Sequence, residues 1–223
     1  SMKYANLGLW KVKFFTTIFV LFTTCSVHAI GFGDIGGMLG GVLGGDGPDL
    51  SGKQTELTGS LRSALINLGK SQVIMAKALG LDEQVMLAEQ NVKNMEAGDM
   101  GTSAEVEKSI EISASVQEEI AKETAKKTIL DVESKAVFVT SIPFYTKGVL
   151  GSIQTGVEAF QIGQNLVSLN PMALLQIGAL VTIVSNLPNL ISKLSSSTGQ
   201  IMDFMTANEI DNSEMKDKLA DSF

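Results

Sequence analysis

The side chains most often used in enzyme and metal chemistry lie together at the start of this chain of 223 residues. The chain holds one cysteine, one histidine and one tryptophan, namely Cys25, His28 and Trp10. Around them run three lysines without an acid, an apolar stretch over residues 14–24, and the small-residue pattern Val27-His28-Ala29. This order is typical of an export signal. We predict that residues 1–29 form a signal peptide that is cleaved after Ala29.

Two other fates of this segment stay open on the sequence. The apolar stretch is about eleven residues long, which is too short for a helix to span a bilayer core of roughly 30 Å. This length argues against a spanning anchor, but an uncleaved anchor stays as the first alternative. A lipoprotein linked through Cys25 is the second, although Phe22-Thr23-Thr24 poorly matches the small and aliphatic residues expected before such a cysteine.

Cleavage would leave residues 30–223 without cysteine, histidine or tryptophan. Of the 17 basic residues, the loss of three signal lysines leaves 14 against 24 acidic ones, a net charge of -10. These counts exclude a Ser-His-Asp triad, a cysteine nucleophile, a zinc site of histidine or thiolate, and a disulfide. Arg62 is the only arginine, so nucleic-acid binding is also disfavoured. We predict no metal and no cofactor.

The remaining polar patterns have ordinary explanations. Ser213 and Lys216 have the Ser-x-x-Lys spacing of a lysine-activated serine, but they lie in a charged tail where nothing desolvates the lysine. The acids between residues 105 and 123 alternate with lysines, as on a solvated helix face. We therefore predict that the protein is not an enzyme and has no catalytic residues.

The apolar spacing predicts helices throughout. Residues 57–79 and 82–98 form a helical hairpin in this interpretation, with Gly80 ending the first helix and Asp82 capping the second. Thr102 and Glu105 match a capping box. No proline or glycine interrupts residues 103–141, which predicts one long helix of roughly 57 Å. Its predicted buried seam is Val106, Ile110, Ala114, Gln117, Ala121, Ala125, Thr128, Val132, Ala136 and Val139.

The second half of the chain is almost without charge. Residues 137–202 carry only Lys147, Glu158 and Lys193. Pro143 is predicted to start a fourth helix, Pro171 a fifth, and Pro188 to end or kink it. The fold class is then all-α, an antiparallel bundle of five or six helices, elongated if helix 103–141 is uninterrupted and compact if it bends near residues 129–134. We expect a glycine-rich segment over residues 30–50, the bundle over 51–206 and an acidic polar tail over 207–223.

Small and apolar faces supply the candidate interaction sites. Glycine pairs recur every four residues between residues 36 and 45, which resembles the glycine zippers of some bacterial envelope proteins, although a flexible tether is the alternative. A second small face lies on the fourth helix and an apolar face on the fifth. The predicted interaction residues are Gly37, Gly41, Gly45, Gly148, Ser152, Gly156, Leu174, Leu175, Ile177 and Leu180.

The sequence thus predicts a non-catalytic exported protein, periplasmic or secreted, that acts as a helical interaction or assembly subunit in the cell envelope. Its partner is another protein or a second copy. The first alternative is a membrane-active protein whose uncharged hairpin, residues 137–191, inserts into lipid in the manner of helical pore-forming toxins. The second is a carrier that encloses an apolar ligand in the bundle.

Overall fold

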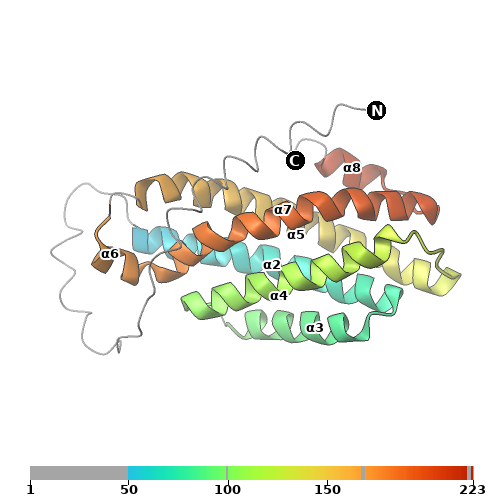
Figure 1. Ribbon diagram of the computed structural model, residues 1–223, viewed down its shortest axis with the longest axis horizontal. Helices are drawn as coiled ribbons and strands as arrows, with labels where there is room; N and C mark the ends of the chain where they lie inside the picture. The colour runs from blue at the N-terminus through green and yellow to red at the C-terminus, as the bar shows by residue number, and fades with distance from the viewer. Residues whose placement is uncertain (1–49, 99, 167–168, 220–221, 223) are drawn as a thin grey trace.

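The computed structural model describes residues 50–98, 100–166, 169–219 and 222. Within these ranges the chain forms helices and no strand (Figure 1). The seven helices are α2 (Leu50–Leu79), α3 (Asp82–Ala97), α4 (Ser103–Ala125), α5 (Val132–Leu166), α6 (Pro171–Gln176), α7 (Gly178–Ala207) and α8 (Ser213–Leu219). The predicted signal peptide and the glycine-rich segment lie outside the described residues.

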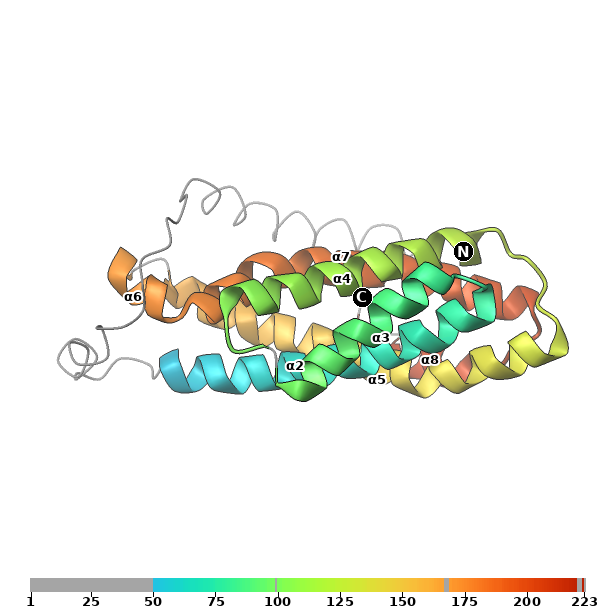
Figure 2. The same cartoon turned by 90° about the horizontal axis from the view of Figure 1, so that it is seen from below.

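Five long helices run along the length of an elongated bundle, and each of them runs opposite to the preceding long helix (Figures 1 and 2). The most extensive contacts join α2 to α5 and α4 to α7, while α3 packs against both α2 and α4. The short helix α8 packs against α5. The predicted all-α antiparallel bundle is confirmed. The described residues form seven helices where five or six were predicted. The predicted fifth helix, which starts at Pro171, is divided into α6 and α7, and the predicted tail contributes α8.

Leucine and methionine side chains at helical spacing form the core. Leu57, Leu61, Leu65, Leu68 and Met75 of α2 are fully or almost fully buried, as their periodicity predicts. On the facing helices the buried aromatic rings of α5 and α7 meet, with the centroids of Phe138 and Phe204 5.2 Å apart. Part of the predicted tail joins this core, because Met215 and Leu219 of α8 are also buried.

The predicted helical hairpin is present, and local backbone chemistry explains its ends. Gly80 and Gly98 have φ of 71° and 105°, a left-handed conformation that suits glycine at the end of a helix. Leu81, and not Asp82, occupies the N-cap of α3, so Asp82 begins the helix instead of capping it. At the start of α4 the capping box predicted from Thr102 and Glu105 is confirmed in both directions.

The predicted single helix over residues 103–141 is wrong, because α4 ends at Ala125 and α5 begins at Val132. The break has tertiary causes. Lys127 adopts a φ of 54°, and the side chain of Asn208, at the end of α7, donates to the carbonyl of Thr128 at 3.1 Å and accepts from the amide of Leu130 at 2.7 Å. The connection also supplies its own cap, since Asp131 accepts from the amide of Ser134.

The predicted seam is correct only in its first part. Val106, Ile110, Ala114 and Gln117 are buried, but the burial then shifts to Ile120 and Thr124, and Thr128, Val132, Ala136 and Val139 are exposed. The interruption rotates the following helix relative to α4, so an eleven-residue repeat no longer describes one continuous face.

Two prolines lie inside helices, although Pro143 was predicted to start one and Pro188 to end or kink one. The predicted helix start at Pro143 and helix end at Pro188 are wrong, and the kink at Pro188 stays a prediction. Pro143 falls in the middle of α5, and Pro188 lies within α7, which continues to Ala207. A proline removes the hydrogen bond to the carbonyl four residues earlier. For Pro143 that carbonyl belongs to Val139, on the exposed side of α5, where water can take the place of the lost donor. The helix is instead interrupted at Ile177, between α6 and α7, where there is no proline.

Candidate functional site

Charged residues in the bundle form exposed pairs and no reactive cluster. Among the described residues, no group of three or more histidine, cysteine, aspartate or glutamate side chains could hold a metal ion. Lys122 bridges Glu118 and Glu119 at 3.2 and 2.7 Å on the solvent side of α4. Ser213 and Lys216 are both exposed, so nothing desolvates that lysine, as the sequence indicated.

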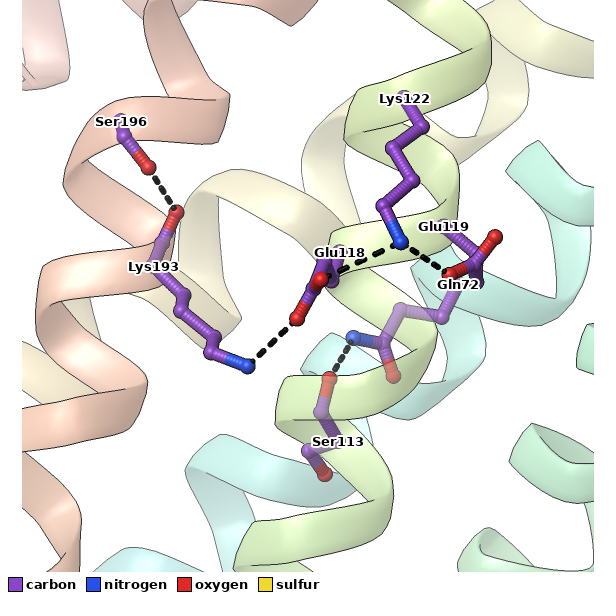
Figure 3. A network of polar contacts seen from close by, with 7 residues as sticks. All are labelled: Gln72, Ser113, Glu118, Glu119, Lys122, Lys193 and Ser196. Carbon is purple, nitrogen blue, oxygen red and sulfur yellow. Dashed lines mark hydrogen bonds and ion pairs between the residues drawn. The ribbon is translucent and has the colours of Figure 1, made fainter.

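The strongest polar feature is buried and spans the bundle. Gln117 of α4 donates to the hydroxyl of Ser197 in α7 at 2.8 Å, and its side-chain oxygen accepts from Gln72 of α2 at 3.1 Å. Gln72 also donates to the carbonyl of Ser113 at 2.8 Å (Figure 3). Tyr145 of α5 shares a 2.9 Å hydrogen bond with Thr198. Four helices therefore meet through one set of hydrogen bonds.

This buried network contains only groups that are neutral at physiological pH. Burial raises the pKa of Tyr145 to about 12, against the smaller effect of the hydroxyls of Ser197 and Thr198. Such a tyrosine neither gives up a proton near neutral pH nor serves as a base. Satisfied buried hydrogen bonds fix how helices align. The sequence marked only Gln117, as a polar residue in an apolar seam. The other residues of the network are also polar residues at buried helix positions, so the same pattern on the facing helices could have identified them.

A groove between α4 and α7, of about 520 Å³, lies over this network. Lys193 of α7 crosses it and pairs with Glu118 of α4 at 2.8 Å (Figure 3). Hydrogen bonds from Lys193 and Lys122 hold the pKa of Glu118 below its usual value. The groove is therefore bridged by an ion pair, and Ala121 and Ala125 lie among the polar residues that line it.

A second groove, of about 570 Å³, runs between α2 and α5. Gly59 of α2 and Gly151 of α5 are among the residues that line it, and most of the others are polar. These include Thr55, Ser60, Ser63, Asn67, Lys147, Gln154 and Glu158.

The small face predicted on the fourth helix contacts the chain's own helices. A Cβ atom on Gly148 would lie 2.5 Å from the backbone nitrogen of Leu68 in α2, and one on Gly156 would overlap Ile191 of α7. Ser152 is buried and donates to the carbonyl of Gly148 at 2.8 Å. The three residues let α5 approach α2 and α7 closely, so this face is already covered within the monomer.

The predicted apolar residues around α6 are divided between core and surface. Ile177 and Leu180 are buried, Leu174 is partly buried, and Leu175 is 43% exposed. The amide of Leu180 donates to the side chain of Gln54 at 3.1 Å, which ties the start of α7 to α2. Gly37, Gly41 and Gly45 lie outside the described residues.

Four of the ten large apolar side chains that are exposed in the described part of the chain lie on one surface of the first half of α5, namely Val132, Val137, Val139 and Phe144, whereas others such as Met86 and Met172 lie on other helices. This surface, called the α5 face below, consists of Val132, Ala136, Val137, Val139, Thr140, Pro143 and Phe144. Val132 is 86% exposed, and Ile129, just before the helix, is 65% exposed. Figure 2 shows this half of α5, in yellow, along the lower edge of the bundle. The sequence pattern did not indicate this face, because three of its residues, Val132, Ala136 and Val139, fit the predicted buried seam.

The opposite side of the same helix explains why this one remains outside. Phe138, Ser141, Tyr145, Gly148 and Val149 of α5 are buried against the bundle. Residues between Val132 and Phe144 that do not point inward are mostly apolar, with no proline or glycine before Pro143 to disrupt the helix. Contiguous exposed apolar area of this kind marks binding surfaces in soluble proteins.

One helix among the described elements, α5, is long and apolar enough to cross a membrane on length and composition. The burial of 39% of its most apolar stretch fits a core helix with one free side. Length and composition do not separate these two cases.

Comparison with protein families, curated proteins and solved structures finds no match to this chain.

Proposed function

We propose that this protein is a non-catalytic, exported assembly subunit that binds its partner through the α5 face. The observation that carries the proposal is the set of exposed valines on an otherwise well-packed helix. Val132 and Val139 are 86% and 43% exposed, whereas the inward residues of α5 are fully buried. Covering such side chains releases water and contributes about 25 cal/mol for each Å² of apolar surface removed from solvent.

The interior of the bundle suits a subunit that presents this face rigidly. The network around Gln117 joins α2, α4, α5 and α7, and the close contact at Gly148 fixes α5 against α2. A rigid scaffold lowers the entropy lost when its surface binds a partner. The neutral state of the network supports a structural use of these polar groups.

The proposal is tested by photo-crosslinking in cells that produce the protein. A photoreactive amino acid is placed at Val139, on the α5 face, or at Glu107, an exposed position of α4 that serves as the control. We expect discrete crosslinked products at Val139 and none at Glu107, with mass spectrometry to identify them. Equal crosslinking at the two positions, or none at either, would contradict the proposal.

A second candidate function is membrane insertion, favoured by the length and composition of α5. It is separated from protein binding by flotation of residues 30–223 with liposomes at high salt. An acidic chain has no electrostatic reason to bind lipid, so flotation would indicate apolar insertion. Val139→Lys would then abolish flotation, whereas Glu107→Lys would not. A folded chain that stays at the bottom of the gradient argues for a protein partner.

A further inference from the structure

The exposed residues at the start of α5 repeat every seven positions. Glu133, Thr140 and Lys147 are all exposed and follow one another at two-turn intervals along the middle of the α5 face. Apolar residues lie beside this line at matching positions. Val132, Ala136, Val139 and Pro143 are on one side of it, and Val137 and Phe144 are on the other. In a helix pair, positions seven residues apart on one helix meet the partner helix at successive two-turn intervals.

The two charges on this line have opposite signs and stand at equal distances from Thr140. Each is seven residues away, about 10.5 Å along the helix. In an antiparallel pair of α5 helices centred on Thr140, Glu133 of each copy would face Lys147 of the other. A parallel pair would instead bring like charges together, which is unfavourable.

The monomer leaves both of these charges without an opposite charge. In the part of the chain that the structure describes, no ion pair within 4.0 Å includes Glu133 or Lys147. Other lysines of the bundle, such as Lys122 and Lys193, do reach a carboxylate. The two free charges are thus available for a contact between chains.

We infer that the α5 face binds the α5 face of a second copy of this chain, in an antiparallel pair centred on Thr140. The inference rests on the proposed function, since it names the partner for the same surface. A two-fold axis at Thr140 makes the surface self-complementary, as a closed dimer requires. It also forms the Glu133–Lys147 pair twice.

The size of the face sets the strength of the dimer. From Glu133 to Lys147 the helix is about 21 Å long, and a helix is roughly 10 Å wide, so the footprint is well below the about 800 Å² per partner of a standard interface. The dimer should therefore be weak, and its population should rise with concentration.

Charge reversal tests both the partner and the orientation. Sedimentation equilibrium of the full chain over a range of concentrations gives the dimer dissociation constant for the wild type, for Glu133→Lys, for Lys147→Glu and for the double variant. Each single reversal creates two like-charge contacts and should weaken the dimer about tenfold. The double variant restores opposite charges across the two-fold axis, so its constant should return to within about twofold of the wild-type value.

Matched controls separate these effects from folding and from net charge. Glu107→Lys and Lys216→Glu make the same charge changes at exposed positions of α4 and α8 and should leave the constant unchanged. Far-UV circular dichroism should be the same for all variants, because both reversed residues are exposed.

Three results would overturn the inference: a monomer at every concentration, a constant insensitive to either reversal, or a double variant as weak as the single ones. A monomer that still gives crosslinks from Val139 to a different protein overturns only the second copy as partner and leaves the proposed function standing. A monomer without such crosslinks overturns both.

Discussion

Replacing Gly148 by alanine should force helices α5 and α2 apart. The sequence alone does not show that these two helices are in contact. Gly148 lies within α5, and the Cβ atom of an alanine there would stand 2.5, 2.7 and 2.8 Å from the N, Cα and Cβ atoms of Leu68 in α2. Two of these are backbone atoms, which cannot rotate away. The helices must therefore move apart along their most extensive contact.

The expected net effect combines two opposing contributions. Overpacking a close contact costs about 3 kcal/mol at the upper end of its usual range, whereas replacing a helical glycine by alanine gains about 1 kcal/mol. Gly148→Ala should therefore destabilise the fold by about 2 kcal/mol. The matched control is Gly59→Ala in α2, where no other atom lies within 4 Å of the new Cβ atom. It should stabilise by about 1 kcal/mol.

Urea unfolding followed by far-UV circular dichroism measures the difference. About 3 kcal/mol between the two variants corresponds to roughly 1.5 M in the unfolding midpoint if the denaturant slope is about 2 kcal/mol per M. If Gly148→Ala proves as stable as Gly59→Ala, α5 does not approach α2 as described. The assignment of the small face to internal packing would then be refuted.

Three further perturbations test the interior and one helix end. Burial raises the pKa of Tyr145 from 10.0 to about 12, so the unfolded chain loses this proton first. The contribution is intact below pH 10, and roughly 2–3 kcal/mol of stability is lost as the pH rises through 12; urea unfolding of Tyr145→Phe should lack this alkaline loss. Gln117→Leu leaves buried partners unsatisfied and should cost roughly 1–3 kcal/mol, whereas Gln72→Leu combined with Gln117→Leu should cost less than the sum of the single changes in a double-mutant cycle. Thr102→Ala removes the confirmed capping box and should cost about 1 kcal/mol by urea unfolding.

A different result in each experiment would contradict the corresponding prediction. If Tyr145→Phe loses as much stability at alkaline pH as the wild type, the loss arises from the ionisation of other groups. Strict additivity of the two glutamine variants would show that they do not share hydrogen bonds. An unchanged midpoint for Thr102→Ala would mean that solvent replaces the cap at no cost.

Local chemistry made the helix ends predictable where one residue type decides them. Gly80, Gly98 and the pair Thr102 and Glu105 act through the backbone conformation or through hydrogen bonds within four residues, and the structure places them as expected. The leucine spacing of α2 likewise identifies its buried side, because burial along a continuous helix follows its period.

Features that depend on distant residues were not predictable in this way. The break after Ala125 is fixed by Asn208, which is about eighty residues away in sequence. That break turned the predicted seam residues Val132 and Val139 outward and so created the α5 face. The small face at Gly148 was recognised correctly as a close-contact surface, but the sequence could not show that α2 already covers it.

The most direct test of the account is chemical labelling of a cysteine at Val139. In a Cys25→Ser background, Val139→Cys and the control Glu107→Cys are treated with a maleimide, once as dilute purified protein and once inside the cells that produce it. The account predicts that both positions react in the dilute protein and that only position 139 is protected in cells, because a partner covers the α5 face. Equal reactivity of the two positions in cells would contradict the claim that this face is the surface through which the protein associates.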